Sequence, residues 1–176
     1  AEPLFRSCLV YRKLNEELHK NPRYGSRRRE AIYKEISLLM AATKSHTLRD
    51  YGCGKGEMAK HLPAVCYDPC VPEFSKKPRA TFDVVACCDV LEHVEPDCLE
   101  YVLGDVFCYA RRAVYLVIST RPAAKTLADG RNAHLIVKPG EWWSELIAQN
   151  FPFWQLTIKN ADISEITIIG VNNGSR

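Results

Sequence analysis

The chain has 176 residues, of which 47% are hydrophobic, enough for one compact domain with its own core. Its net charge of +3 is uneven: residues 1–34 contain nine Lys and Arg against four Asp and Glu, and the remainder carries −2. The apolar runs are too short for a membrane-spanning helix and the N-terminus is charged, so we expect a cytoplasmic protein without a membrane partner.

The cysteines and histidines argue against disulfides and metal sites. Eight cysteines lie mostly inside apolar segments, and no C-x-x-C pair occurs. A chain of this length does not need disulfides to fold, so we expect reduced thiols. The five histidines are scattered, and we therefore expect no metal.

The N-terminal part reads as a helical, basic segment, residues 1–45, attached to a core of residues 46–171 within a single domain. Residues 28–42 carry apolar side chains at helical spacing. The run "RYGSRRRE" indicates either a solvated helix face or a site for an anionic partner. Its arginines are Arg23, Arg27, Arg28 and Arg29.

From residue 47 onward, short apolar strands alternate with helices. This alternation, followed by two strands with a short connection, predicts an α/β fold: an open, doubly wound sheet with a C-terminal antiparallel hairpin. In chain order we expect a strand ending at Asp50, a helix over 56–62, strands over 64–67 and 82–90, a helix over 96–110, a strand over 113–120, a helix from Pro139, and a hairpin of 153–159 and 165–171.

The segment "LRDYGCGKGEMAKHL", residues 48–62, places three alternating glycines where such a sheet binds its ligand. A P-loop is excluded because Lys55 is followed by Gly56 rather than Ser or Thr. A dinucleotide fingerprint would require glycine where the chain has Glu57, and a carboxylate repels a pyrophosphate. The glycine loop is therefore not built for phosphate.

Two aspartates indicate what the loop holds instead. Asp50 precedes the glycines and suits a cationic group, whereas Asp68 ends the next strand and is placed to accept two ribose hydroxyls. The ligand implied is a nucleoside that carries a cation. S-adenosylmethionine, with its sulfonium and amino-acid tail, meets both demands.

At this point the sequence resembles a family. "LRDYGCGKGEM", "CYDP" and "FDVVACCDVLEHV" are similar to three motifs of class I S-adenosylmethionine-dependent methyltransferases, in order and on the expected strands. The third is most similar to the subgroup of ubiquinone-biosynthesis O-methyltransferases. The resemblance covers nearly three quarters of the chain, and its short length resembles small stand-alone methyltransferases of phages and bacteria.

The resemblance implies a role for particular residues. Asp50 would lie near the amino group of the cofactor, the glycines would line its methionine part and ribose, and Asp68 would bind the ribose. Asp89 would face the transferred methyl group, with Leu91 and His93 beside the substrate entrance. Alternatively, Asp89 and Glu92 could simply begin the next helix, where carboxylates are favoured. The implied cofactor-binding set is Asp50, Gly52, Cys53, Gly54, Gly56, Asp68, Pro69, Asp89, Val90 and Leu91.

One departure from the family concerns the segment between Asp68 and Asp83. The family inserts a helix and a strand there, but fourteen residues are too few for a complete crossover. We therefore expect this unit to be missing, together with the acid that usually meets the adenine amino group. Phe74 or the backbone near Cys88 could cover the base instead.

The expected chemistry is methyl transfer to an O or N nucleophile of an unidentified small molecule or macromolecule. His134, Asp89 and His93 are the catalytic candidates, with His134 the preferred general base. The "DVLE" segment disfavours amino methylation of DNA bases. Two alternatives stay open: a ribose 2′-O-methyltransferase of RNA, using Asp89, Lys125 and Glu165, and a non-catalytic cofactor-binding module that grips nucleic acid.

Overall fold

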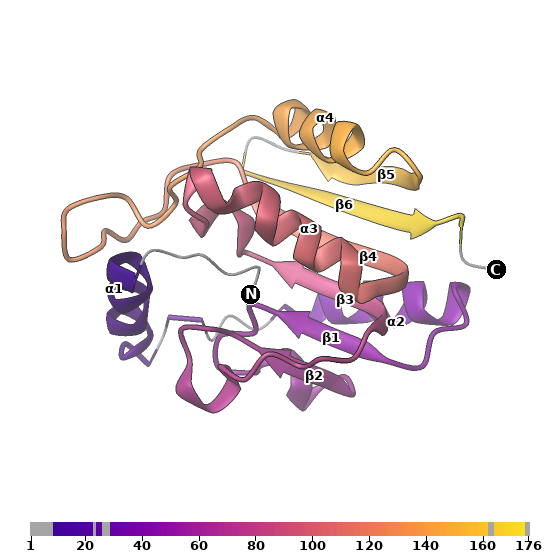
Figure 1. Cartoon of the computed structure of the whole chain (residues 1–176), viewed down its shortest axis with the longest axis horizontal. Coiled ribbons are helices and arrows are strands. Elements are labelled where there is room, and N and C mark those ends of the chain that lie inside the picture. Colours follow the sequence, from indigo (N-terminus) through magenta and orange to yellow (C-terminus); the bar gives the residue numbers. More distant parts are fainter. Residues whose placement is uncertain (1–8, 23, 26–28, 162–163, 175–176) are drawn as a thin grey trace.

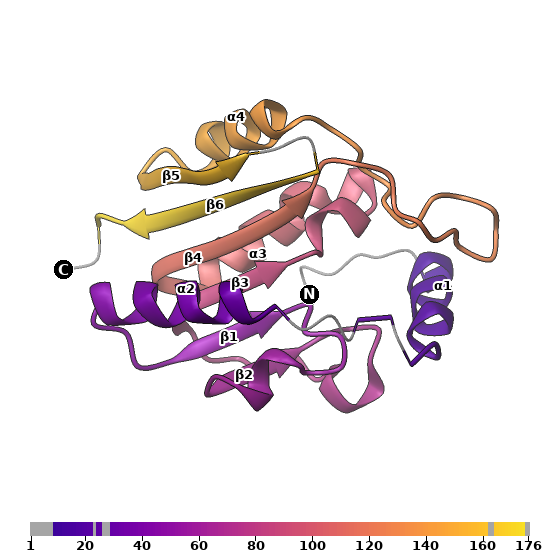
Figure 2. The ribbon, with the colours of Figure 1, turned by 180° about the vertical axis from the view of Figure 1, so that it is seen from behind.

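The structure is a computed structural model that describes residues 9–22, 24–25, 29–161 and 164–174. It is a six-stranded sheet with helices on both faces (Figures 1 and 2). The helices are α1 (Leu9–His19), α2 (Glu30–Ala42), α3 (Leu99–Tyr109) and α4 (Gly140–Asn150), with short 3-10 turns η1 (Met58–Lys60), η2 (Pro72–Phe74), η3 (Leu91–His93) and η4 (Pro96–Cys98); the strands are β1 (Leu48–Tyr51), β2 (Ala64–Tyr67), β3 (Phe82–Cys88), β4 (Ala110–Ser119), β5 (Trp154–Ala161) and β6 (Glu165–Asn172).

The strand order is β2-β1-β3-β4-β6-β5. The first four strands are parallel, and β6 runs antiparallel to both β4 and β5. From β1 the chain turns to one side to form β2 and then crosses to the other side to form β3. The switch point between β1 and β3 is the place where such a sheet binds its ligand.

Successive residues of the central strands point to opposite faces, and each face has its own apolar core. Helices α3 and α4 cover one face, where Val85, Cys87 and Leu116 are buried. Helix α2 covers the other, above Val84, Ala86 and Tyr115 (Figure 2). This pattern explains why residues 84–88 of β3 are all apolar.

The predicted fold class is confirmed, including the missing helix-strand unit. Between β2 and β3 the chain forms only the turn η2, so β2 is the edge strand of the sheet. The hairpin of β5 and β6 also lies where it was expected.

The predicted helix over 56–62 is wrong, because only η1 forms there. Gly54 and Gly56 have positive φ angles of 53° and 70°, which an α-helix cannot contain. Pro63 restricts the residue before it, so fewer than two turns remain for a helix. The glycine loop consequently does not present the N-terminus of an α-helix to its ligand.

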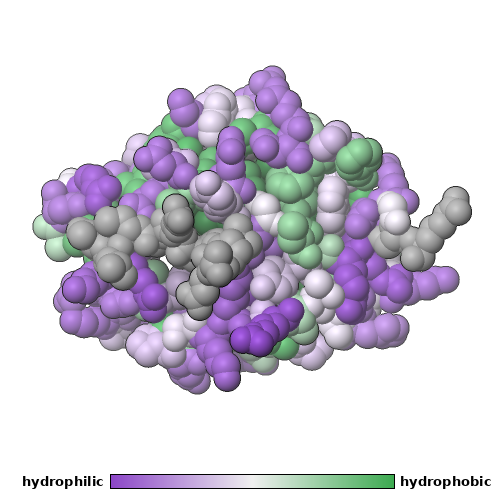
Figure 3. Space-filling model, viewed as in Figure 1, coloured by the Kyte–Doolittle hydropathy of each residue, from purple (hydrophilic) through white to green (hydrophobic). Residues whose placement is uncertain are grey.

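Hydrophilic residues cover much of the face shown in Figure 3, and apolar residues gather in its upper part, over α3 and α4. Within the described ranges, no helix combines the length and the apolar character needed to cross a bilayer. The seven described cysteines are free thiols.

Candidate active site

A cavity of about 670 Å³ opens at the carboxyl ends of the parallel strands. Its walls are the glycine loop after β1, the residues that follow β2 and β3, and the loop after β4. Helix α1 lies at this same end of the sheet, beside the long loop between β4 and α4 (Figure 1). The cavity is large enough for a nucleoside cofactor together with part of an acceptor.

The glycine loop is held so tightly that side chains would not fit. The backbone N–H groups of Gly52 and Cys53 donate to the carbonyl of Tyr67, at 2.7 and 3.1 Å. A Cβ at Gly52 would lie 2.3 Å from Val90 Cγ2, and one at Gly54 would lie 2.5 Å from the carbonyl oxygen of Gly25. Both glycines also have positive φ, so the loop requires glycine on two counts.

Asp50 lines the cavity and is only 5% exposed. Within the described part of the chain, its carboxylate accepts no hydrogen bond and forms no ion pair. Burial, and secondarily the charge of Asp68, raise its pKa to about 7. A buried carboxylate without a partner is costly, and it becomes favourable when a cation binds beside it.

Asp68 lies across the loop and is fixed by the backbone. One carboxylate oxygen accepts the N–H of Gly54 at 2.9 Å, and the other accepts the N–H of Cys70 at 2.8 Å. Burial nevertheless raises its pKa. Each oxygen retains a lone pair for a further donor, so Asp68 can still accept hydroxyl groups from a ligand in the cavity.

The N-terminal segment contributes a wall that sequence reasoning missed. Tyr11, Asn15, His19 and Tyr24 all line the cavity. The Tyr11 hydroxyl donates to the carbonyl of His93, and the ring of His19 meets that of Tyr24 edge to face at 4.9 Å. No local motif marks these residues, because their role depends on where α1 docks.

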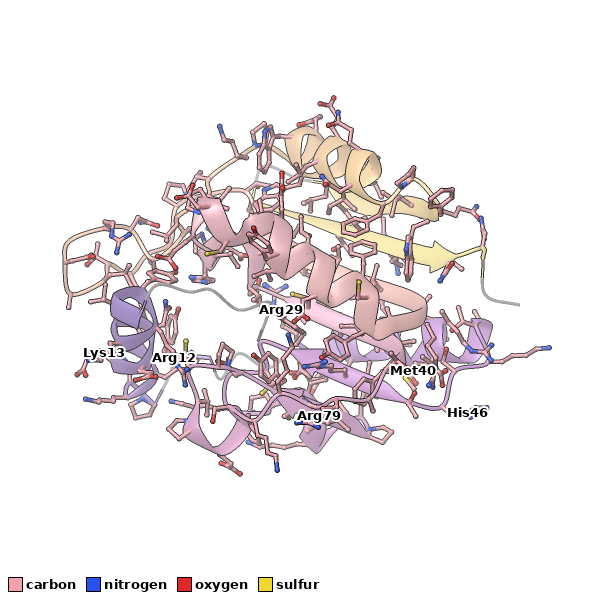
Figure 4. All side chains as sticks on the ribbon, in the orientation of Figure 1. Arg12, Lys13, Arg29, Met40, His46 and Arg79 are labelled. Carbon is pink, nitrogen blue, oxygen red and sulfur yellow. The ribbon has the colours of Figure 1, made fainter. Side chains whose placement is uncertain are left out.

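Arg29 lies inside the site. Its guanidinium contacts Asp89 at 3.0 Å and Glu165 at 3.1 Å, and its side chain is only 11% exposed. Figure 4 shows it near the centre of the molecule, whereas Arg12 and Lys13 lie on α1. Arg29 therefore does not belong to an exposed basic patch; Arg23, Arg27 and Arg28 lie outside the described residues.

Asp89 is held in an unusual conformation. Its φ of 57° is positive, which is uncommon for a residue other than glycine, and its N–H donates to the carbonyl of Val117 at 2.9 Å. The ion pair with Arg29 helps to fix it. Asp89 does not begin the next helical turn, because η3 starts at Leu91 with Val90 as its N-cap residue. Strained backbone of this kind concentrates at functional sites.

His93 and His134 come together although they are far apart in sequence. Their rings meet edge to face with centroids 4.6 Å apart. His93 Nδ1 lies 2.7 Å from the carbonyl of Ala133, and His134 Nδ1 lies 2.6 Å from that of Arg121. A carbonyl only accepts, so each Nδ1 carries a proton and donates it, which leaves Nε2 as the nitrogen of each ring that is available to another group. Burial lowers the pKa of His93 to about 4.

Most of the predicted site residues line the cavity, but two do not. Leu91 is fully buried in the core, and Gly56 packs against Phe74 and Cys66, 3.2 Å and 3.4 Å from the position of a Cβ. Phe74 is also absent from the wall, whereas Cys88 is part of it. The predicted residues that the structure brings together there are Asp50, Gly52, Cys53, Gly54, Asp68, Pro69, Asp89, Val90, His93 and His134.

A family model described as a methyltransferase domain matches residues 24–161. The chain belongs to this family. It has the Rossmann-like fold of the class I S-adenosylmethionine-dependent methyltransferases. No curated protein matches the sequence.

Solved methyltransferases share the fold of this chain at low identity. DhpI in complex with S-adenosylhomocysteine is 18% identical over 93% of this chain and 94% of its own, with a TM-score of 0.58. Magnesium protoporphyrin IX methyltransferase from Synechocystis PCC 6803, with bound S-adenosylmethionine, is 12% identical over 95% and 99%, with a TM-score of 0.62. The 1,6-didemethyltoxoflavin N1-methyltransferase of Burkholderia thailandensis is 12% identical over 98% and 99%, with a TM-score of 0.59.

These structures hold S-adenosylmethionine or S-adenosylhomocysteine. The cavity of this chain fits S-adenosylmethionine on two observations. The carboxylate of Asp50 is buried and has no partner among the described residues, as a site for an ammonium or sulfonium cation requires. Gly52 and Gly54 line the cavity in a loop that has no room for a Cβ at either position. Asp50 would hold the amino-acid part of the cofactor, and Asp68 its ribose.

Proposed function

We propose that the protein transfers a methyl group from S-adenosylmethionine to an oxygen or nitrogen nucleophile, with the acceptor entering beside Asp89, His93 and His134. When bound, the cofactor supplies a methyl carbon already activated by the sulfonium. The protein then has to bind the cofactor and the acceptor, orient them and exclude water. Where the nucleophile is a hydroxyl, it also has to receive the proton.

A single observation carries this proposal: Asp50, whose carboxylate has no partner among the residues described, and the pair of His93 and His134 line the same cavity. Asp50 and the glycine loop form its cofactor side. His93 and His134 form another part of the wall, with Asp89 at the end of β3. The acceptor and the methyl donor can therefore meet inside one cavity, where the in-line geometry of a displacement can be held.

His134 is the better general base of the two histidines. Its proton on Nδ1 is held by the carbonyl of Arg121, which leaves the Nε2 lone pair for the acceptor. His93 is a weaker base at neutral pH, because burial lowers its pKa. This supports the preference that the sequence suggested, without testing it.

Calorimetry with S-adenosylmethionine and S-adenosylhomocysteine tests the cofactor half of the proposal, and radiolabelled methyl transfer into fractionated cell extract tests the other half. The variant His134→Ala should bind the cofactor like the wild type but transfer methyl groups about a hundredfold more slowly. His46→Ala is the matched control, because His46 is an exposed histidine at the other end of the sheet (Figure 4). Failure of the wild type to bind either cofactor form would refute the proposal.

The ribose 2′-O-methyltransferase alternative has some geometric support. Asp89 and Glu165 flank Arg29, and Lys125 lines the same cavity. The non-catalytic module and the anionic partner of residues 23–28 stay predictions. Salt-dependent binding of RNA without methyl incorporation would favour the module, whereas incorporation into ribose would favour the 2′-O enzyme.

A further inference from the structure

Three side chains on one wall of the cavity form a cluster that methyl transfer does not by itself explain. Glu92, His93 and His134 each offer one ligand atom, and these atoms lie within 4.8 Å of one another. Glu92 and His93 belong to η3, and His134 lies in the loop between β4 and α4. The expectation of no metal relied on the histidines being scattered, but the fold brings two of them together.

The carboxylate of Glu92 is buried and incompletely paired. The residue is fully buried, and one oxygen, Oε1, accepts the N–H of Ser119 at 3.1 Å. The other oxygen, Oε2, has no hydrogen-bond partner within the part of the chain that the structure describes. An unsatisfied buried oxygen of this kind is expensive unless a ligand completes it.

Both imidazoles are held as metal-binding histidines are usually held. In each ring the Nδ1–H donates to a backbone carbonyl, which fixes the tautomer and the ring orientation. Nε2 is then the nitrogen that is available to bind a metal ion. This hydrogen bond to the second ring nitrogen is the common arrangement in protein metal sites, where it also raises the basicity of the ligand.

We propose that Glu92, His93 and His134 bind a divalent first-row transition-metal ion such as Mn²⁺, Co²⁺ or Zn²⁺. Two imidazoles and one carboxylate form a ligand set that suits these ions rather than Mg²⁺ or Ca²⁺, which prefer oxygen. Ligand atoms around a tetrahedral ion lie about 3.4 Å apart, as bonds of about 2.1 Å require, so binding would draw these three side chains together.

The three ligands leave coordination positions open, because all three residues also line the cavity. An acceptor hydroxyl bound at an open position would lose its proton more readily, since a metal ion lowers the pKa of a bound oxygen. This role rests on the proposed function, and in it His134 acts as a ligand rather than as the base. Binding of the metal itself does not depend on methyl transfer.

The test adds Co²⁺ to the full chain after treatment with a chelator and follows the visible absorption of the bound ion. We expect one ion per chain. The variants Glu92→Gln and His134→Ala should each weaken binding at least about tenfold, whereas His46→Ala should not. Glu92→Gln keeps the oxygen that accepts from Ser119, so it preserves the fold, which circular dichroism checks.

Equal affinity in the wild type and Glu92→Gln, or a spectrum dominated by thiolate charge transfer, would overturn the metal site by placing the ion on other groups. S-adenosylmethionine binding to chelator-treated protein separates the two proposals. Cofactor binding without Co²⁺ binding would reject the metal and keep the proposed function. Co²⁺ binding without cofactor binding would do the reverse.

Discussion

The aspartates at the two ends of the parallel sheet differ in their partners and in the direction of their pKa shifts. At the amino end of β3, Asp83 accepts the N–H groups of His46 and Thr47 at 2.8 and 3.1 Å and pairs with Arg111 at 2.9 Å. Burial acts to raise its pKa, but these partners outweigh it and hold the pKa well below its usual range. At the carboxyl end of β1, Asp50 has no such partner in the part of the chain that the structure describes, and burial raises its pKa to about 7.

The difference separates a carboxylate that stabilises the fold from one that is kept for a ligand. The partners of Asp83 come from the protein and are present as soon as it folds. Those of Asp50 must come from outside, so the folded protein carries an unfavourable group that only a bound cation can compensate. Removing each charge should therefore have opposite consequences for stability.

The largest expected effect is on the stability of the cofactor-free protein above neutral pH. Folding raises the pKa of Asp50 from 3.8 to about 7. The contribution of Asp50 to the free energy of unfolding is therefore fully present below the unfolded pKa and is lost as the pH rises through the folded pKa. At about pH 8, Asp50→Asn should be more stable than the wild type by up to about 4 kcal/mol. Chemical unfolding of both proteins at about pH 5 and pH 8 measures this. If the difference in stability between wild type and variant were the same at both pH values, Asp50 would not be buried as a charge.

The same variant should lose cofactor affinity. Asp50→Asn removes the charge that faces the cavity, and a charge-assisted contact contributes about 3 kcal/mol, or a hundredfold in affinity. Calorimetry with S-adenosylmethionine measures the change. Asp129→Asn is the control, because Asp129 is an exposed residue paired with Arg131 away from the cavity wall, and it should bind as the wild type does.

Gly54→Ala should destabilise the protein by about 2–3 kcal/mol. The new Cβ would meet the backbone oxygen of Gly25 at 2.5 Å, and the residue has a positive φ. Gly104→Ala in α3 is the matched control, since beyond its chain neighbours and the adjacent backbone of its own helix no atom lies within 4 Å of its Cβ position. The control should be slightly stabilising, by about 0.5–1 kcal/mol, because alanine favours a helix. Thermal unfolding distinguishes the two, and a Gly54 variant as stable as its control would contradict the described loop.

Asp83→Asn should cost about 2 kcal/mol of stability near neutral pH and leave cofactor affinity unchanged. The stabilisation from Asp83 is present above its unfolded pKa of about 4 and is lost as the pH falls through its lower folded pKa. The wild type should therefore lose more stability on acidification than the variant does. Acid titrations of the melting temperature test this, with the exposed Asp97→Asn as the control.

The smallest expected effect is the pH dependence of cofactor binding. Asp50 is mostly protonated at about pH 6 and ionised at about pH 8, so affinity for S-adenosylmethionine should rise about tenfold over this range. Asp50→Asn should show a flat profile. A wild-type profile that is equally flat would mean that another group holds the cation.

Features set by local pattern could be predicted from the sequence, whereas those set by packing could not. The positions of the strands follow from apolar runs, and the glycine loop follows from alternating glycines near Asp50. The helix over 56–62 failed because hydrophobic spacing does not report φ, and the glycines turn the backbone left-handed. The inward position of Arg29 could not be foreseen, because its partners Asp89 and Glu165 lie 60 and 136 residues away.

The contact between Gly25 and the glycine loop bears on the working cycle of the protein. Lys55 N–H donates to the carbonyl of Gly25 at 2.9 Å, so Gly25, which also lines the cavity, is bound to the loop that would cradle the cofactor. If the proposed function holds and the exchange of spent for fresh methyl donor needs this hydrogen bond to break, turnover can be no faster than that opening.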